Sequence, residues 1–326
     1  MSLSWSRIHL LAAREASRAH RDLGVDTTRQ IDPFAALDRA GVLVLRRRLD
    51  HMAGLYLPPD PRDGRDVPAV LVNVAHPPSK QRFTAAHELG HHRRDHDISL
   101  DNDTEWLARG EAPASERERM AEAFAAWFLM PKRLVVATLT AQNLQADSLT
   151  ADGAYALSLE LGTSYAATVR HLADMGLLTT RRSEQLLRIA PQSIKKELGG
   201  LDVAADTRRD VHLFHIGRPD ASVAILEGDA LVLEAPETPS SGFLWQVTPL
   251  VGLALVRDEY RSPDAALGGR GWRRFLFRAE SPGQWDVALE LRRPWQHGAA
   301  AETVRVTVVA RPQPVPGLVQ PQLLVA

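Results

Sequence analysis

The stretch at residues 83–92 constrains the fold more than any other part of the chain, because it contains the pattern His87-Glu88-x-x-His91. Two residues four apart on a helix share one face, so both imidazoles can bind the same metal ion. Glu88 lies on an adjoining face, where its carboxylate can act as a general base toward an attacking water molecule. The spacing therefore predicts a helix that carries two ligands and the base of a zinc peptidase.

The residues before this pattern predict what the helix packs against. Residues 67–74 have the β-branched content of a strand, and a proline-containing turn at 76–78 leads from that strand into the helix. Further upstream, apolar spacing predicts helices at 5–23 and 32–40, followed by a strand at 42–45. A strand beside a metal-binding helix suits a peptidase, because an edge strand can align an extended substrate by main-chain pairing.

A third metal ligand must come from elsewhere, since a catalytic zinc ion uses three protein ligands and keeps one position open. The chain has no cysteine, which leaves His, Asp or Glu. Residues 115–131 predict a helix that places Glu118 and Glu122 on one stripe among apolar positions. A buried acid needs a partner, so either glutamate could bind the metal, and Glu122 could instead accept a hydrogen bond from a ligand histidine. Glu118 also fits a capping box with Ser115.

Four other side chains near the pattern are weaker candidates for the metal. His92 and His96 lack the spacing that completes the first pair, and solvated histidines at a helix end are the favoured interpretation. Asp101 and Glu105 are reserve candidates in an acidic, irregular stretch at 97–111.

The stretches 81–91 and 118–131 together resemble the ImmA/IrrE family of bacterial zinc endopeptidases, and the resemblance extends over residues 5–190. It implies a zincin-like α+β fold and a third ligand thirteen positions before Pro131, which selects Glu118 over Glu122. The family often has Asn where this chain has Glu122. The resemblance also implies a protein substrate, typically a helix-turn-helix repressor whose cleavage releases transcription in a stress response. The metal would be zinc or manganese, because a site of two histidines and one glutamate accepts either.

The composition limits other classes of function. Charged residues make up 24% of the chain and the formal net charge is −1, so no long-range field favours nucleic acid or a membrane surface. No apolar run approaches the roughly 18 to 20 residues of a membrane span, and the apolar stretch at 8–13 is too short for a secretory signal. The absence of cysteine is compatible with a reducing compartment. We expect a soluble, cytoplasmic protein.

A helical segment at 136–200 follows the peptidase core, which the pattern places at 1–135. Residues 155–172 have the helix-glycine-helix rhythm of a helix-turn-helix. A DNA-reading helix projects basic and amide side chains, and this one offers Arg170 and little else. A packing role is therefore favoured over DNA reading.

From residue 205 the pattern changes to short alternating strands separated by turns, which predicts an all-β, immunoglobulin-like sandwich over 205–313. Trp245 and Trp285 lie within strands and should fill its core. Trp295 directly follows Pro294 and is a candidate for an exposed contact. The proline-containing segment 314–326 predicts a flexible tail.

Three loops of this sandwich, at 237–245, 267–271 and 292–295, resemble the inhibitory loops of chagasin-type cysteine-protease inhibitors, with a resemblance over 207–312. In that family the loops cluster at one end and insert into the cleft of a papain-like protease. Glu237 and paired serines stand where the family prefers Asn and threonines. Glycines permit close backbone approach and an exposed Trp is a rigid anchor. The residues expected to contact protein are Ser240, Ser241, Gly242, Phe243, Gly268, Gly269, Gly271, Arg293, Pro294 and Trp295.

These features together predict a zinc endopeptidase with His87, His91 and Glu118 as ligands and Glu88 as base, joined to a sandwich that recognises a substrate or a regulating protein. Two alternatives belong to other classes. One is a cysteine-protease inhibitor or sensor with a regulatory amino-terminal half. The other is a DNA-binding regulator that has kept the peptidase fold, against which the near-neutral charge counts.

Overall fold

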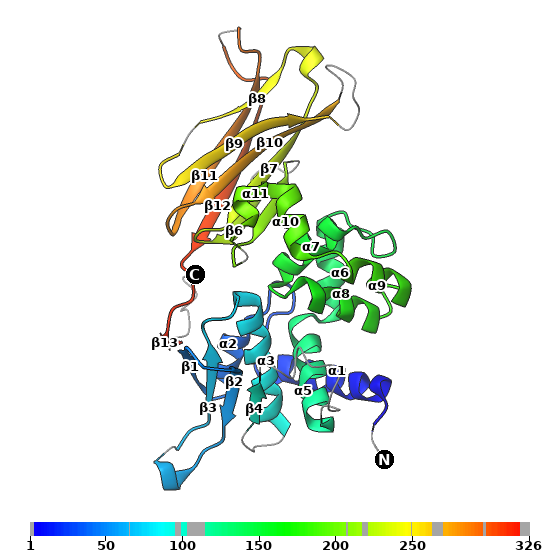
Figure 1. Ribbon diagram of the computed structural model, residues 1–326, viewed down its shortest axis with the longest axis vertical. Coiled ribbons are helices and arrows are strands. Elements are labelled where there is room, and N and C mark those ends of the chain that lie inside the picture. The colour runs from blue at the N-terminus through cyan, green and yellow to red at the C-terminus, as the bar shows by residue number, and fades with distance from the viewer. Residues whose placement is uncertain are drawn as a thin grey trace. The chain divides into compact units, whose positions relative to one another are not determined.

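The structure is a computed structural model that divides into two compact units (Figure 1). The first unit comprises Met1–Ile189 together with Pro314–Ala326, and the second comprises Ala190–Gln313. Each unit has its own sheets and its own core. The described residues are 3–64, 66–94, 99–102, 115–206, 208–216, 221–248, 250–262, 270–295 and 298–319.

The first unit is built on a sheet with the strand order β13-β1-β3-β2-β4. Strands β1 and β3, which the sequence predicts, run parallel; β13 pairs antiparallel with β1, β2 pairs antiparallel with β3, and β4 pairs antiparallel with β2. Strand β4 lies at one edge of this sheet. The strands are β1 (Leu43–Arg47), β2 (Met52–Leu57), β3 (Ala69–Asn73), β4 (Ser99–Asn102) and β13 (Gly317–Leu318).

Helix α3 packs on strands β2 and β3 of this sheet, and α5 packs against both α3 and α1. Arg93 fastens the end of α3 to α1, because its guanidinium lies 2.8 Å from Glu15 Oε1 and 2.7 Å from Asp22 Oδ2. The helices of this unit are α1 (Trp5–Asp22), α2 (Pro33–Arg39), α3 (Pro78–Arg94), α5 (Glu116–Leu129), α6 (Lys132–Ala141), α7 (Ala151–Leu161), α8 (Tyr165–Asp174) and α9 (Thr180–Leu187), and a short 3-10 turn lies at Pro61–Asp63.

The helix-glycine-helix segment forms α7 and α8, with Gly162 at the turn between them. Gly162 has a φ of +65°, a conformation that favours glycine, and its carbonyl accepts a hydrogen bond of 2.9 Å from Arg82 Nε of α3. Thr168, Val169 and Leu172 of α8 are buried. The segment is therefore linked to the metal-binding helix by a hydrogen bond, and its second helix is buried in the first unit, in line with the packing interpretation.

The second unit is a sandwich of two sheets, with the strand orders β5-β7-β10-β9 and β6-β12-β11-β8. Its core lies between the sheets and includes Phe275, Phe277 and Trp245, while Trp285 is only partly buried and packs against it. The elements are α10 (Pro191–Gly199), α11 (Leu201–Ala204), β5 (Val211–His215), β6 (Ala221–Leu226), β7 (Ala230–Glu237), a 3-10 turn at Pro239–Ser241, β8 (Leu244–Val247), β9 (Leu253–Arg261), β10 (Gly271–Ala279), β11 (Gly283–Arg292) and β12 (Glu302–Arg311). The mixed α+β first unit and the all-β sandwich of the second unit, which two short helices precede, confirm the predicted fold class.

Two features differ from the boundaries drawn on sequence pattern. Helix α10 packs on β5 and β7, so the division between the units falls after Ile189 instead of at residue 200. Within the segment predicted as a tail, Gly317 and Leu318 pair with β1, and Val319 N donates a hydrogen bond of 2.9 Å to Val44 O. Residues 320–326 lie outside the described part of the chain.

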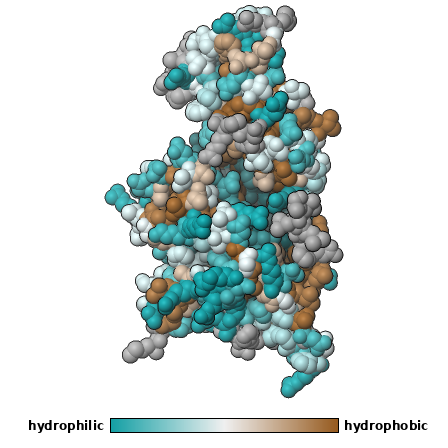
Figure 2. All heavy atoms as spheres, turned by 180° about the vertical axis from the view of Figure 1, so that it is seen from behind, coloured by the Kyte–Doolittle hydropathy of each residue, from teal (hydrophilic) through white to brown (hydrophobic). Residues whose placement is uncertain are grey.

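No single described helix is long and apolar enough to cross a bilayer, although α5 and α6 together pass on length and composition with a 43° bend between them. In the face drawn in Figure 2, hydrophobic residues form separate patches among hydrophilic ones.

Candidate functional site

Helix α3 places His87 and His91 side by side on its buried face. Their side chains are 6% and 0% exposed, and their Nε2 atoms lie 3.0 Å apart. Both rings face α5. This helix can approach α3 closely because Gly90 has no side chain: an added Cβ would lie only 2.9 Å from the ring of Phe124. The histidine pair predicted from the spacing is therefore assembled, in a place shielded from water.

Helix α5 brings Glu118 to the same point. Its Oε2 atom lies 3.2 Å from His87 Nε2 and 3.4 Å from His91 Nε2. The backbone half of the predicted capping box is also present, since Ser115 Oγ accepts a hydrogen bond of 3.2 Å from Glu118 N. Burial opposes ionisation, but the contacts with the two imidazoles outweigh it and hold the pKa of Glu118 well below its ordinary range. Glu118 thus remains a carboxylate next to the histidines.

The geometry of these three atoms fits a metal ion. His87, His91 and Glu118 are the group of possible metal ligands found among the described residues, with ligand atoms within 4.8 Å of one another. In a tetrahedral site with bonds of roughly 2.0 to 2.1 Å, neighbouring ligand atoms are about 3.3 to 3.4 Å apart, close to the separations seen here. Two imidazoles and one carboxylate suit zinc, and three ligands leave a fourth position open.

Glu88 lies directly beside this group and is fully buried. It faces Gly54 of strand β2, where an added Cβ would lie 3.1 Å from Glu88 Oε1 and would overlap Thr84. A side chain at position 54 would collide with Thr84 and crowd the Glu88 carboxylate, so glycine suits this position. Residue spacing does not single out Gly54, although a glycine inside a strand pattern is a recognised sign of close approach by another group.

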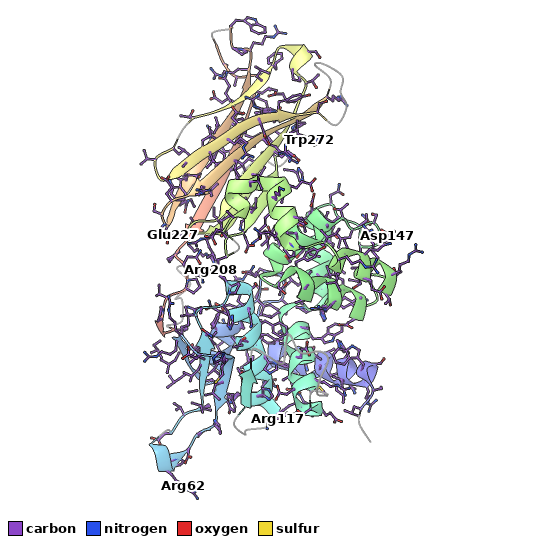
Figure 3. The ribbon with its side chains drawn as sticks, viewed as in Figure 1. Arg62, Arg117, Asp147, Arg208, Glu227 and Trp272 are labelled. Carbon is purple, nitrogen blue, oxygen red and sulfur yellow. The ribbon has the colours of Figure 1, made fainter. Side chains whose placement is uncertain are left out.

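Two further contacts surround the histidines. Arg117, labelled in Figure 3, directs its Nε toward His91 Nδ1 at a distance of 3.4 Å. Tyr56 Oη lies 3.0 Å from His92 Nδ1, so His92 contacts strand β2 and is not part of the three-ligand group. For the other reserve candidates, His96 and Glu105 lie outside the described residues, and only the backbone of Asp101 is described, in β4.

Glu122 lies one turn beyond Glu118 on α5 and lines a separate pocket with Phe83 of α3 and Trp5 of α1. Burial lowers the pKa of the nearby His9, and the negative charges of Asp174 and Glu122 oppose that shift. The predicted role of Glu122 as an acceptor for a ligand histidine remains a prediction.

In the second unit, the first predicted recognition loop is a tight turn. Ser241 Oγ donates a hydrogen bond of 2.7 Å to Thr238 O and accepts one of 3.2 Å from Phe243 N, and Gly242 follows with a φ of +76°. At the base of the loop, the buried carboxylate of Glu237 accepts a hydrogen bond of 2.7 Å from Trp245 N. Burial raises the pKa of Glu237, while the hydrogen bond from Trp245 N opposes this.

The third loop packs on the first. The Arg293 guanidinium lies 4.5 Å from the centre of the Phe243 ring, and a Cβ at Gly242 would lie 2.9 Å from the Trp295 ring. Trp295 is 70% exposed, and Pro294 is also exposed. The structure therefore brings Gly242, Phe243, Arg293 and Trp295 together in one exposed surface, which we call the loop surface.

The middle loop is only partly described. Gly268 and Gly269 lie outside the described residues. Gly271 is buried at the start of β10, where it pairs with Glu237. An added Cβ there would lie 2.5 Å from Tyr260 Oη, so this glycine allows close packing inside the sheet.

Comparison with known families gives two matches that lie in different units. Residues 37–170 match the model of the IrrE N-terminal-like domain, peptidase family M78. Residues 225–308 match the chagasin family of peptidase inhibitors, I42. Both family resemblances predicted from the sequence are thereby confirmed. The first match supports a metallopeptidase domain with a divalent metal, for which His87, His91 and Glu118 are suitable ligands.

Solved structures similar to the chain align with about a third of it. A cysteine protease inhibitor from Entamoeba histolytica, EhICP2, is 21% identical, with 32% of this chain and 97% of that chain covered and a TM-score of 0.29. Amebosin, solved in solution, is 20% identical over 32% and 98% of the two chains, with a TM-score of 0.27. PbICP-C, solved in complex with falcipain-2, is 14% identical over 30% and 98%, with a TM-score of 0.23. No curated protein sequence matches the chain.

Proposed function

From a metallopeptidase-family domain joined to a chagasin-family domain, we propose that this chain is a zinc-dependent endopeptidase that hydrolyses a peptide bond in a specific protein. One observation carries the proposal. Three ligand atoms from two helices lie 3.0 to 3.4 Å apart, and a buried glutamate follows the first ligand directly in sequence.

The residues of α3 and α5 have separate tasks in this reaction. His87, His91 and Glu118 would hold the ion, and a bound zinc supplies a Lewis acid that polarises the scissile carbonyl and acidifies water. Glu88 receives the proton of the attacking water and can pass it to the leaving amine. Its burial and its position against Gly54 fix the carboxylate for this transfer.

The substrate class proposed for this site is a regulatory protein, in particular a helix-turn-helix repressor whose cleavage would change transcription in a stress response. The support is the match to the IrrE N-terminal-like family over residues 37–170. We propose a cytoplasmic location, for which the lack of cysteine is the supporting observation. Manganese is the alternative metal, because the donor set accepts it.

The loop surface of the second unit supports a second candidate function, the binding of a protein partner. Phe243, Arg293 and Trp295 present aromatic and cationic groups of the types that are enriched at interface hot spots. The match to the chagasin family makes a papain-like cysteine protease the partner to test first, and the substrate of the first unit is the alternative. Either partner could deliver a protein to the peptidase or regulate it.

Two alternatives from the sequence remain as competing proposals. In one, the chain is a cysteine-protease inhibitor or sensor, and the first unit only regulates it. In the other, it is a DNA-binding regulator, which is disfavoured because Thr168, Val169 and Leu172 of α8 are buried and the formal net charge is −1.

The decisive test is metal content of the full chain, measured by elemental analysis for the wild type and for His91→Ala and Glu118→Gln. We expect about one zinc ion per chain, with loss in both variants, because each removes one of three ligands. Glu160→Gln is the matched control, since it makes the same change at an exposed position on α7, outside the ligand group and the pocket. A wild type that binds no metal when zinc is supplied would rule out the peptidase, and papain inhibition or duplex binding would then separate the alternatives.

A further inference from the structure

A pocket of about 400 Å³ in the first unit lies next to the metal centre but does not include its ligands. Its wall contains Phe83, four residues before His87 on α3, and Glu122, four residues after Glu118 on α5. Four residues of helix correspond to about 6 Å, and an extended peptide advances roughly 3.3 to 3.6 Å per residue. A peptide held at the metal could therefore place a side chain here from a position one or two residues from the cleaved bond.

The polar atoms of two histidines in this pocket can be assigned from their partners. Trp127 Nε1 donates to His9 Nδ1 at 3.2 Å, so the proton of a neutral His9 lies on Nε2. His171 Nε2 lies 3.1 Å from the carbonyl oxygen of Met130, which can only accept, so its Nδ1 carries a lone pair. His171 is 1% exposed, and no described group makes a hydrogen bond to this Nδ1.

Both histidines are uncharged near neutral pH. Burial lowers the pKa of His171 to about 4, against the opposing effect of the Met130 carbonyl, and burial also lowers the pKa of His9. The charged side chains of the pocket are then Glu122, Asp174 and Arg170, two acids and one base. The pocket therefore has an excess of negative charge and a neutral hydrogen-bond acceptor in its wall.

Asp174 has an arrangement that suits a cation. Its Oδ1 accepts a hydrogen bond of 3.3 Å from Trp5 Nε1, and its Oδ2 lies 3.8 Å from His9 Nε2, beyond hydrogen-bond distance. The described donor, Trp5 Nε1, is neutral, and His9 is neutral and does not donate to Asp174, so neither of them balances the carboxylate charge. The ring of Phe83 adds a wall that attracts cations and the methylene chains behind them, while the ring of Trp5 already has the Arg119 guanidinium 5.9 Å from its centre.

We propose that this pocket binds a basic side chain of the substrate, a guanidinium or ammonium group, at a position next to the scissile bond, with Asp174 as the group that selects it. The inference rests on the proposed peptidase function. The pocket would make the enzyme prefer sequences with Arg or Lys beside the cleaved bond.

The first test is direct binding, which does not depend on cleavage. Nα-acetyl-arginine amide and its uncharged isostere Nα-acetyl-citrulline amide are titrated into the full chain and followed by NMR. We expect arginine amide to bind about tenfold or more tightly than citrulline amide, because a charge-assisted hydrogen bond is lost. Asp174→Asn should remove this difference, whereas Asp147→Asn, an exposed position beyond α6 labelled in Figure 3, should keep it. Equal binding of the two amides to the wild type overturns the proposal without any variant.

The second test reads the position of cleavage. A peptide library derived from a whole proteome is digested by the zinc-loaded wild type, Asp174→Asn and Glu88→Gln, and the residues beside the new ends are counted by mass spectrometry. We expect Arg and Lys to be enriched by the wild type and not by Asp174→Asn. Cleavage without this enrichment overturns the pocket assignment and leaves the peptidase standing. Binding of arginine amide without any cleavage overturns the peptidase and, with it, the assignment to a substrate side chain.

Discussion

The metal centre of the first unit and the loop surface of the second unit present their functional side chains in opposite ways. The metal centre lies between two packed helices, and His87, Glu88 and His91 are at most 6% exposed. The residues of the loop surface lie in turns between strands, and Trp295 is 70% exposed. Chemistry on a metal needs groups held in a dry, fixed position, whereas recognition of a protein needs apolar and cationic groups that lose water only on binding.

The same difference decides how each site is supported. In the metal centre, glycines at 54 and 90 remove side chains so that a carboxylate and a second helix can come close. In the loop surface, Gly242 supplies a turn with positive φ on which the ring of Trp295 rests. Substitutions at the first site should therefore change catalysis, whereas those at the second should change affinity and leave the fold intact.

The largest effect is expected for Glu88→Gln in the first unit. Removal of a general base typically costs about 10²- to 10⁴-fold in rate, and the amide cannot take the proton of water. Peptide cleavage with zinc bound measures the loss, and elemental analysis should show that the variant keeps its metal. Glu160→Gln, at an exposed position on α7, is the control of equal charge change. A Glu88→Gln variant as active as the wild type would mean that another group is the base.

The two units should also differ in how acid destabilises them. Burial lowers the pKa of His171 to about 4, while an unfolded histidine titrates near 6.5, so the folded first unit binds fewer protons in this range. The contribution of His171 to the free energy of unfolding is fully present at a pH above the pKa of an unfolded histidine. Up to about 3 kcal/mol of it is lost as the pH falls toward 4. Burial lowers the pKa of His20 as well, which adds to the same loss.

In the second unit the corresponding group is a carboxylate. Burial opposes ionisation of Glu234, but hydrogen bonds from His215 and Arg274 outweigh it and lower its pKa. Its contribution is therefore lost only as the pH falls below the ordinary range of a glutamate. Calorimetry over a pH series should show the first unit weakening at higher pH than the second. His171→Gln should reduce that early loss, whereas the exposed His51→Asn should not. Simultaneous weakening of both units would contradict this assignment.

The sequence predicts the two sites to different depths for a physical reason. His87 and His91 are four residues apart on one helix, so their geometry is local and can be read from spacing. The spacing could not decide between Glu118 and Glu122, because that choice depends on how α5 is rotated against α3. The family resemblance favoured Glu118, and the structure places its Oε2 atom 3.2 Å from His87 Nε2.

Contacts between distant segments were not predictable from spacing at all. Gly54 meets Glu88, and Gly242 meets Trp295, only after the strands are paired, so spacing predicts neither contact, although Gly242 was expected in a recognition loop. The pocket wall combines His9 and His171, which lie on α1 and α8. Strand pattern did predict the sandwich, because alternation is a local signal, but the packing of α10 on β5 depends on long-range contacts.

The loop surface gives a prediction of intermediate size. Trp295→Ala should weaken binding to papain, the test partner, by about 30-fold, which corresponds to the roughly 2 kcal/mol of a hot-spot aromatic. The melting temperature should change little, because the side chain is 70% exposed and fills no core. The measurement is the inhibition constant of the full chain toward papain.

The matched control for this variant is Trp272→Ala. Trp272 is 40% exposed and lies on β10 outside the three loops (Figure 3), so its loss should leave the inhibition constant unchanged. Equal effects of both variants would show that the partner binds the face of the sheet instead of the loop surface.

The smallest expected effect concerns Arg117, where the charge beside the metal centre works against the metal. Binding of an ion at His91 Nε2 needs a lone pair there, so the imidazole proton must lie on Nδ1. Arg117 Nε also points its proton toward Nδ1, at 3.4 Å, and the guanidinium carries a positive charge. Arg117→Gln should therefore strengthen zinc binding, by only several-fold because the side chain is partly exposed and screened.

A competition titration with a chelator measures this affinity. Arg119→Gln is the matched control, since that guanidinium donates to Leu3 O at 2.9 Å and lies 5.9 Å from the centre of the Trp5 ring. If Arg117→Gln weakens zinc binding, Arg117 supports the ligand instead of opposing the ion, and His91 must then be held by a different rotation of its ring. The direction of the change in zinc affinity therefore tells which nitrogen of His91 faces the metal. The loop surface has no counterpart to this distinction, because its affinity depends on buried area and not on the position of a proton.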